Sequence, residues 1–334
     1  MKSIKLAVVG ATGVVGQMMI KVLEEKELPI SKCSFFASAK SKGKLLNFMG
    51  EKVEVEELTE NSFNTGFDFA LFSVGASTSK KFSPIAAEKG CIVIDNSSAF
   101  RMDPNVPLIV PEVNSEDISN NHGIIANPNC STIQAVIALK PLDSAYKIKR
   151  IVYSTYQAVS GAGIKGIHDL QNGIENYYHS DKTYDLQKFK YPIFNNCIPH
   201  IDDFLDNGYT KEEEKIINET RKILKRPDLA VTATTVRVPV FNSHGESINV
   251  EFENDFSLDE LKSILKNADG IILKDDPQNN IYPLQTQSNG QDKVLVGRIR
   301  RDYSVPYGIN LWITADNVRK GAASNAVQIL EKLI

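Results

Sequence analysis

The sequence predicts a parallel α/β domain followed by a mixed α+β domain, and three observations carry this prediction. Short apolar segments rich in β-branched residues alternate with amphipathic segments up to about residue 129. A glycine-rich turn separates the first such pair. Later segments are longer and alternate apolar with polar residues, which is typical of an antiparallel sheet with one solvated face. The strand–helix–strand order of the first region favours parallel strands joined by right-handed crossovers.

The first region has the rhythm of βαβ units. In its first helix Val15, Met19, Val22 and Leu23 share one apolar stripe. The expected strands are residues 4–9, 34–38, 67–74 and 91–95, and the expected helices are residues 14–27 and 83–89, with Pro84 near the start of the second.

The second region changes character after Asn129. Capping boxes at Thr210 with Glu213 and at Ser257 with Glu260 predict two helix starts. Further helices are expected at 131–139 and 318–333, strands at 151–157, 231–240, 247–253, 293–300 and 309–315, and a loop at 178–191. We therefore expect a domain over residues 1–128, a second over 129–315, and a C-terminal helix over 316–334 that returns to the first domain.

The amino-acid composition excludes several classes of function. The 334 residues are 42% hydrophobic and 24% charged with a net charge of −3, as in ordinary globular proteins. This near-neutral charge gives no basic surface that would bind nucleic acid or an anionic membrane. No apolar run is long enough to span a membrane. The four cysteines form no CxxC pair, so we expect neither a disulfide framework nor a metal site, and a cytoplasmic setting.

A glycine turn, GATGVVG, follows the first expected strand and opens the first helix. Such glycines let the backbone approach a pyrophosphate, which the N–H groups of the helix start then hold. The spacing is G-x-x-G-x-x-G rather than G-x-G-x-x-G, and a tight turn that binds nothing is the alternative. The expected cofactor-binding residues of this turn are Gly10, Thr12, Gly13, Val14 and Val15.

The end of the second strand indicates which dinucleotide binds. NAD sites carry an acid there to accept from the ribose 2′-hydroxyl. This chain instead has Ser38, Lys40 and Ser41, followed by more lysines, and such groups suit a 2′-phosphate. We therefore predict NADP, with a solvated lysine-rich loop as the alternative.

Cys130 is the candidate nucleophile. It follows Asn-Pro-Asn and precedes an apolar helix, so the positive end of the helix dipole favours its thiolate. Cys91, inside an apolar strand, and Cys33 fit the ordinary interpretation of a small buried side chain.

Eight separated motifs, which span nearly the whole chain in one order, resemble those of the aspartate-β-semialdehyde dehydrogenases, bacterial type. They are GATGVVG, SSAFRM, VPEVN, NPNCST, STYQAVSGAG, ETRKI, VRVPVFNSH and DNVRKGAA. The family reduces L-aspartyl 4-phosphate with NADPH to L-aspartate 4-semialdehyde, on the route to lysine (through diaminopimelate), threonine, methionine and isoleucine. The resemblance implies a Rossmann-type NADP-binding domain and a largely antiparallel catalytic and dimerisation domain.

The resemblance also assigns the chemistry. The Cys130 thiolate attacks the acyl phosphate, phosphate leaves, and hydride reduces the resulting thioester. His244 manages the thiol proton and stabilises the tetrahedral states, and Gln157 orients the acyl group and the thiol. The other histidines lie in segments without a matching motif.

Further residues follow by resemblance. Arg237 suits the α-carboxylate because a guanidinium fork binds it at two points. Glu219 takes the ammonium, although with Lys222 it could also form an ordinary surface ion pair. The remaining implied contacts are Arg101 and Lys222 for phosphate, Asn129 for substrate, and Ser160, Gly161 and Asn317 for cofactor.

Two alternatives of different kinds remain. One is a reductase of a related acyl phosphate, such as N-acetyl-γ-glutamyl-phosphate reductase or glyceraldehyde-3-phosphate dehydrogenase, against which Glu219 argues because neither substrate offers a free ammonium. The other is a dinucleotide-binding sensor without catalysis, against which the set Cys130, Gln157, Arg237 and His244 argues. The resemblance further implies a homodimer or a tetramer.

Overall fold

The computed structural model describes residues 3–179 and 185–334 and divides into two compact units. The first unit comprises Met1–Asn129 with Ala322–Ile334, and the second comprises Cys130–Gly321. Among the described residues, no helix combines the length and the apolar character needed to cross a membrane.

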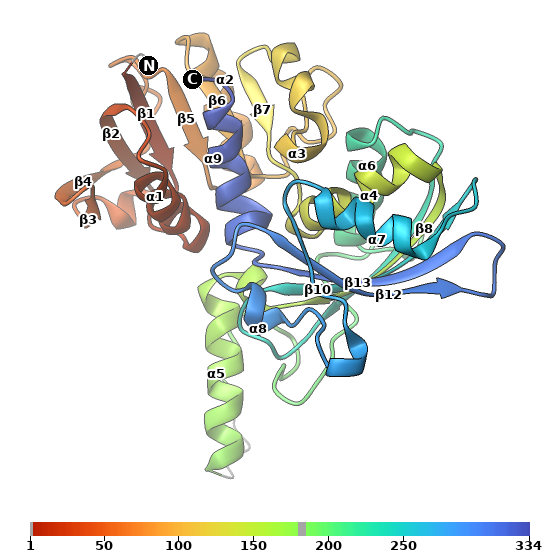
Figure 1. The fold of residues 1–334 in the computed structure, drawn as a ribbon. Coiled ribbons are helices and arrows are strands. Elements are labelled where there is room, and N and C mark those ends of the chain that lie inside the picture. The colour runs from red at the N-terminus through yellow and green to blue at the C-terminus, as the bar shows by residue number, and fades with distance from the viewer. Residues whose placement is uncertain (1–2, 180–184) are drawn as a thin grey trace. The chain divides into compact units, whose positions relative to one another are not determined.

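The first unit is built on a seven-stranded sheet in the order β3-β4-β2-β1-β5-β6-β7, parallel except for the β3–β4 pair (Figure 1). The strand order reverses at β1, so ligands are expected at the carboxyl end of this strand. The elements are β1 Ile4–Val9, α1 Val14–Lys26, β2 Ile30–Ala37, β3 Leu45–Phe48, β4 Glu51–Glu57, β5 Phe69–Phe72, α2 Ala76–Glu88, β6 Ile92–Asp95, α3 Pro111–Asn114, β7 Ile124–Ala126 and α9 Ser324–Glu331.

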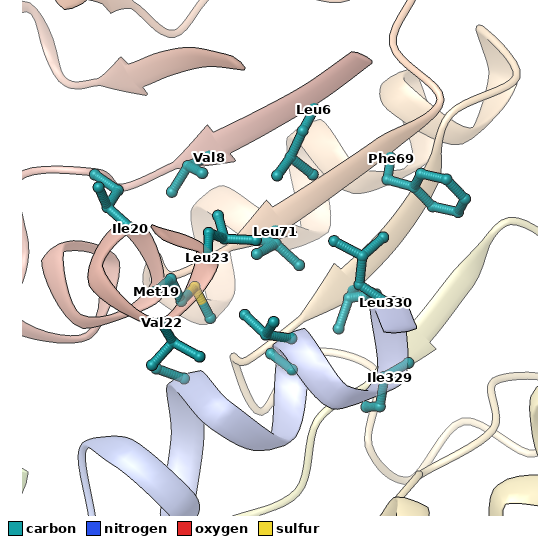
Figure 2. Close-up of a cluster of buried hydrophobic side chains, with 14 of the residues drawn as sticks. Leu6, Val8, Met19, Ile20, Val22, Leu23, Phe69, Leu71, Ile329 and Leu330 are labelled. Carbon is teal, nitrogen blue, oxygen red and sulfur yellow. The ribbon is translucent and has the colours of Figure 1, made fainter. Parts of the chain in front are cut away.

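Strand β1 shows why residues 6–9 form a continuous apolar run after the exposed Lys5. Leu6 and Val8 face the core formed with α1 and α9, as Figure 2 shows, while Ala7 and Val9 face the core on the α2 side. A parallel strand covered by helices on both faces buries every side chain. The stripe predicted for α1 is confirmed, because Met19, Val22 and Leu23 are buried there.

The turn after β1 depends on two glycines. Gly10 has a φ of +84°, and an added Cβ would lie 2.1 Å from the carbonyl oxygen of Ser73. A Cβ on Gly16 would lie 2.2 Å from the carbonyl oxygen of Gly10. At Gly13 the nearest atom would be 3.4 Å away, which is an ordinary contact. The fold itself therefore requires glycine at positions 10 and 16 but not at 13.

The second unit contains a six-stranded mixed sheet in the order β11-β12-β13-β10-β8-β9, with three antiparallel and two parallel pairings (Figure 1). Helices α4, α6 and α7 pack on one face. The elements are α4 Cys130–Tyr146, β8 Ile148–Gln157, α5 Ile164–Tyr178, α6 Lys211–Ile223, β9 Ala230–Arg237, β10 His244–Phe252, α7 Leu258–Asn267, β11 Ile271–Leu273, α8 Gln285–Ser288, β12 Val294–Asp302 and β13 Gly308–Ala315.

The alternation predicted for β10 is confirmed. Ile248, Val250 and Phe252 are buried, whereas Asn249 and Glu251 are partly exposed. This pattern gives the sheet one face in the core and one face near solvent.

Helix boundaries follow the capping signals where these exist. At α6 the Thr210 side chain accepts from the Glu213 N–H and the Glu213 side chain accepts from the Thr210 N–H, which confirms the predicted capping box. Ser257 accepts from the Glu260 N–H at the start of α7.

Two predictions of local structure were wrong, and one helix was missed. Helix α2 begins at Ala76, so Pro84 lies inside it, where the helix loses one backbone hydrogen bond. The segment after residue 318 is a π-helix over Arg319–Ala323 before α9 begins. Helix α5 was not predicted at all. Of the loop predicted at 178–191, residues 180–184 lie outside the described residues.

We predict that Gly16→Ala destabilises the protein by about 1–3 kcal/mol, because the methyl group meets backbone atoms that cannot move aside. Gly13→Ala, in the same turn, is the matched control and should change the free energy of unfolding by less than about 1 kcal/mol. Guanidinium denaturation of both variants measures this, and equal destabilisation would contradict the packing argument.

Candidate active site

Cys130 is the first residue of α4, at the positive end of the helix dipole. Its side chain is half-buried, and the Gly321 backbone packs so closely that a Cβ there would lie 2.8 Å from the Cys130 Cβ. Burial raises the pKa of the Cys33 and Cys91 thiols to about 12, so these two cysteines stay protonated. Cys130 differs from these two in its position at a helix start, where the helix dipole favours a thiolate.

His244 is fully buried at the start of β10. Its Nδ1 accepts a hydrogen bond from the backbone N–H of Ala158 at 3.0 Å. A neutral imidazole that accepts at Nδ1 carries its proton on Nε2. Burial, followed by the charge of Arg237, holds its pKa well below the usual range. Nε2 has no hydrogen-bond partner among the described residues. The side chain therefore presents an available N–H donor.

Arg237 ends β9 and is also buried. Its Nη1 donates to the carbonyl oxygen of Ala158 at 2.7 Å. Burial lowers the pKa of Arg237, while the negative charges of Glu212 and Cys130 raise it. Arg237 therefore lies within electrostatic range of the Cys130 sulfur, and each stabilises the charged form of the other.

Gly161 lies against both of these side chains. A Cβ at this position would be 2.9 Å from Arg237 Nη1 and 3.4 Å from His244 Nε2. The structure thus brings together Cys130, Arg237, His244 and Gly161 within the second unit, although these residues lie in four separate segments of the sequence.

Gln157 is the last residue of β8, opposite Arg237 in the ladder with β9. Its Oε1 accepts from the Thr155 hydroxyl at 3.2 Å, and its Nε2 donates to Glu212 Oε1 at 3.2 Å. These two bonds fix the orientation of the amide. Sequence reasoning did not single out Glu212, because an acid in the first turn of a helix is already explained by the helix dipole.

Asn317 links two turns of the site. Its Oδ1 accepts from the Ser243 N–H at 2.9 Å, and its amide also hydrogen bonds with the Ser160 hydroxyl. Ser243 has a φ of +71°, which is strained for a residue with a side chain, and it immediately precedes His244. Asn317 was predicted to contact the cofactor. In this structure its side chain holds the Ser243 backbone, directly before the buried histidine, and the Ser160 hydroxyl.

Glu219 and Lys222 both lie on α6. Glu219 is only 1% exposed, so the alternative of an ordinary surface ion pair does not fit it, whereas Lys222 is half-buried. The hydroxyl of Thr220 on the same helix hydrogen bonds with the Tyr153 hydroxyl at 3.1 Å and fastens α6 to β8.

The residues predicted for the dinucleotide in the glycine turn and after β2 lie in the first unit, whereas Ser160, Gly161 and Asn317 belong to the second. The Gly13 N–H donates to the Gly10 carbonyl oxygen, and the Thr12 hydroxyl donates to the Ser41 hydroxyl at 3.3 Å. The glycine turn therefore meets the segment that follows β2, where Ser38 and Lys40 are exposed. Val14 and Val15 are the first two residues of α1.

Arg101 and Asn129, predicted to bind substrate, also belong to the first unit. Arg101 is buried, with Nε donating to the Asn127 carbonyl oxygen at 2.9 Å and Nη2 to the Asn96 carbonyl oxygen at 2.8 Å. Asn129 is buried directly before α4.

Family models match most of the chain. The model for the semialdehyde dehydrogenase NAD binding domain covers residues 5–121, and the model for the semialdehyde dehydrogenase dimerisation domain covers residues 139–320. These matches define the class as a two-domain dinucleotide-dependent dehydrogenase of semialdehydes.

Comparison with individual relatives narrows this class of dehydrogenase further. The aspartate-semialdehyde dehydrogenase of Aquifex aeolicus is 53% identical over 99% of this chain and 98% of its own length, and that of Bacillus subtilis is 45% identical with the same coverage. The crystal structure of aspartate semialdehyde dehydrogenase II from Vibrio cholerae has a TM-score of 0.96 at 47% identity, covering 99% of this chain and 98% of its own. The chain belongs to the aspartate-semialdehyde dehydrogenase family, which confirms the resemblance.

We predict that Gly321→Ala lowers kcat/KM at least tenfold, because the added methyl group displaces the Cys130 side chain. The rate at which iodoacetamide alkylates Cys130 should change as well. Gly75→Ala is the control, since no atom lies within 4 Å of its added Cβ. Wild-type activity in Gly321→Ala would show that this contact does not position the thiol.

The lowered pKa of His244 predicts a pH-dependent stability. The unfolded chain binds a proton at this histidine below about pH 6.5 while the folded chain does not, so acid favours unfolding. Wild-type should lose stability relative to His244→Gln as the pH falls from 7 to 5, by up to about 1.4 kcal/mol per pH unit. Above pH 7 the difference should be constant. Denaturant unfolding measures it, and a difference independent of pH would contradict burial of the neutral form.

Proposed function

We propose that this enzyme reduces L-aspartyl 4-phosphate with NADPH to L-aspartate 4-semialdehyde, releasing phosphate and NADP, through a thioester on Cys130. The arrangement of Cys130, Arg237 and His244 within one unit is the observation that carries this proposal. Homologues of high identity share the activity in their names, and one similar structure from Vibrio cholerae, 46% identical, is described as complexed with ASA.

The first step needs a thiolate. The start of α4 and the charge of Arg237 both favour the anionic form of Cys130. The sulfur attacks the acyl carbon, the carbon–oxygen bond to phosphate breaks, and the thioester remains on Cys130.

His244 then acts as a donor. With Nδ1 committed to the Ala158 N–H, its Nε2–H can stabilise the negative oxygen of each tetrahedral state. Of the two roles predicted for this histidine, the geometry favours stabilisation of the tetrahedral states over removal of the thiol proton. After reduction, the sulfur–carbon bond of the thiohemiacetal breaks and the aldehyde leaves.

The first unit fits a dinucleotide with a 2′-phosphate. Gly13 has no steric need to be glycine, so its missing side chain suits close approach of a pyrophosphate to the start of α1. Ser38, Lys40 and Ser41 supply hydroxyl and ammonium groups after β2. Bound NADPH would supply the hydride for thioester reduction. A similar structure from Candida albicans, 25% identical with a TM-score of 0.78 over 99% of this chain and 98% of its own, is described with NADP.

The proposed substrate contacts match the charges of the site residues to the charges of the substrate. Arg237 binds the α-carboxylate, buried Glu219 binds the ammonium, and Arg101 and Lys222 bind the phosphate. Gln157, with its amide fixed by Thr155 and Glu212, orients the acyl group. Asn129 completes the proposed substrate contacts, and Ser160, Gly161 and Asn317 are proposed near the cofactor.

We infer the oligomeric state from the family and the cellular location from the cysteines. We infer that the second unit forms a homodimer, since it matches the dimerisation domain of the family. Because none of the four cysteines, all of them described, forms a disulfide, we place the enzyme in the reducing cytoplasm. It would serve the synthesis of lysine, threonine, methionine and isoleucine.

The test is the reverse reaction with NADP, phosphate and each of three aldehydes: aspartate semialdehyde, N-acetylglutamate semialdehyde and glyceraldehyde 3-phosphate. We expect turnover with the first alone. Cys130→Ser should lower kcat at least 10³-fold, because a hydroxyl is a far weaker nucleophile than a thiolate. Unchanged turnover in Cys130→Ser would contradict the covalent mechanism, and turnover with either other aldehyde alone would contradict the substrate.

Cofactor choice gives a separate prediction. Ser38→Asp should lower kcat/KM for NADPH at least tenfold and raise it for NADH, because an acid after β2 repels the 2′-phosphate and accepts from a ribose hydroxyl. Gly13→Ala should weaken binding of both cofactors. Asn47→Asp, exposed on β3, is the matched control. Equal rates of wild-type with NAD and NADP would overturn this assignment.

A further inference from the structure

Glu246 is a buried carboxyl that the proposed reaction does not use. It lies on β10 two residues after His244, so both side chains leave the strand on the same face. Its exposed fraction is 0%. Neither carboxyl oxygen has a partner of ordinary hydrogen-bond geometry among the residues that the structure describes.

The groups around Glu246 come from four elements. Thr155 of β8 and Ile313 of β13 are its ladder neighbours. Ser131 and Gln134 of α4 are close enough for their polar groups to act on the carboxyl, and the charge that acts on it is that of another acid, Glu212 of α6. The Tyr153 phenol, also within its electrostatic range, is fully buried.

These surroundings favour the protonated acid. An ionised carboxyl in an apolar interior is costly unless a cation or several hydrogen bonds compensate it. Burial raises the pKa of Glu246 well above its usual range and the charge of Glu212 adds to this, while Ser131 and Gln134 oppose it only in part. Glu246 therefore favours its protonated form more strongly than an exposed glutamate does.

A neutral carboxylic acid can donate one hydrogen bond and accept another. Both groups of α4 that face it belong to the first turn and a half of that helix, directly after Cys130. We propose that Glu246 is a positioning residue, which as a neutral acid ties the first turn of α4 to β10 and so places the Cys130 sulfur. The inference rests on the proposed function, in which this sulfur is the nucleophile.

For this role, the absence of charge on Glu246 matters as much as its hydrogen bonds. An ionised Glu246 would add a negative charge beside the turn that carries the thiolate, and like charges disfavour ionisation. Glutamine has nearly the same shape, remains neutral and can both donate and accept. Leucine keeps the bulk but makes no hydrogen bond. Comparing these two variants therefore separates the hydrogen-bonding role of Glu246 from its contribution to packing.

The experiment compares Glu246→Gln, Glu246→Leu and the control Glu253→Gln, whose carboxyl is exposed, all in a Cys197→Ser background so that alkylation reports on Cys130. Infrared spectra should show a protonated carboxyl band in wild-type at neutral pH that Glu246→Gln removes and Glu253→Gln keeps. The pH profile for alkylation of Cys130 by iodoacetamide, and kcat/KM within threefold, should be preserved in Glu246→Gln.

In Glu246→Leu we expect kcat to fall at least tenfold with little change in KM, and the alkylation profile to shift to higher pH. Two results would overturn the proposal: a carboxyl band unaffected by Glu246→Gln, or an equal loss of kcat in Glu246→Gln and Glu246→Leu. Infrared and alkylation measurements do not depend on turnover. Failure of the proposed function would therefore appear as an inactive wild-type enzyme with these two readouts intact.

Discussion

The backbone of one residue, Ala158, holds both Arg237 and His244, the two buried basic side chains of the second unit. The carbonyl oxygen of Ala158 accepts from Arg237, and its N–H donates to His244 Nδ1. Because backbone groups cannot ionise, neither bond changes over the working pH range. The rest of the site depends on this arrangement: it sets which imidazole nitrogen carries the proton, and it holds the guanidinium within electrostatic range of the Cys130 sulfur.

Hydrogen bonds from two segments, the turn after β8 and the residues before β10, hold the backbone around Ala158. Strand β8 ends at Gln157, and the next residues form a tight turn in which the Val159 N–H donates to the Val240 carbonyl oxygen. On the other side Asn317 fastens Ser243, whose left-handed conformation aims the chain into β10. A site built on backbone contacts of this kind is preorganised before substrate arrives.

Features set by neighbouring residues were predictable from the sequence. The apolar run at Ile4–Val9, the capping box at Thr210 and the alternation along β10 all depend on local chemistry, and the structure agrees with each. The placement of Cys130 at a helix start is also local. The roles of the site residues came from the resemblance to a family and remain predictions.

What could not be predicted involves contacts between distant segments. Nothing near Glu212 indicates that it fixes the Gln157 amide 55 residues away, because that contact exists only when α6 packs beside β8. The proton position on His244 likewise depends on Ala158, 86 residues earlier. Helix α2 could not be extended back to Ala76 from local rules, since Pro84 argues for a start, and packing on the sheet outweighs its missing hydrogen bond.

The fixed imidazole has a consequence for inhibition by transition metals. Thiolates attract zinc and copper, and stable capture needs a second ligand such as a histidine lone pair. Here the lone pair of His244 points at the Ala158 amide, and the nitrogen left available carries a proton. A metal ion would have to break a buried hydrogen bond to gain that ligand, so the site can keep a reactive sulfur without becoming a chelator.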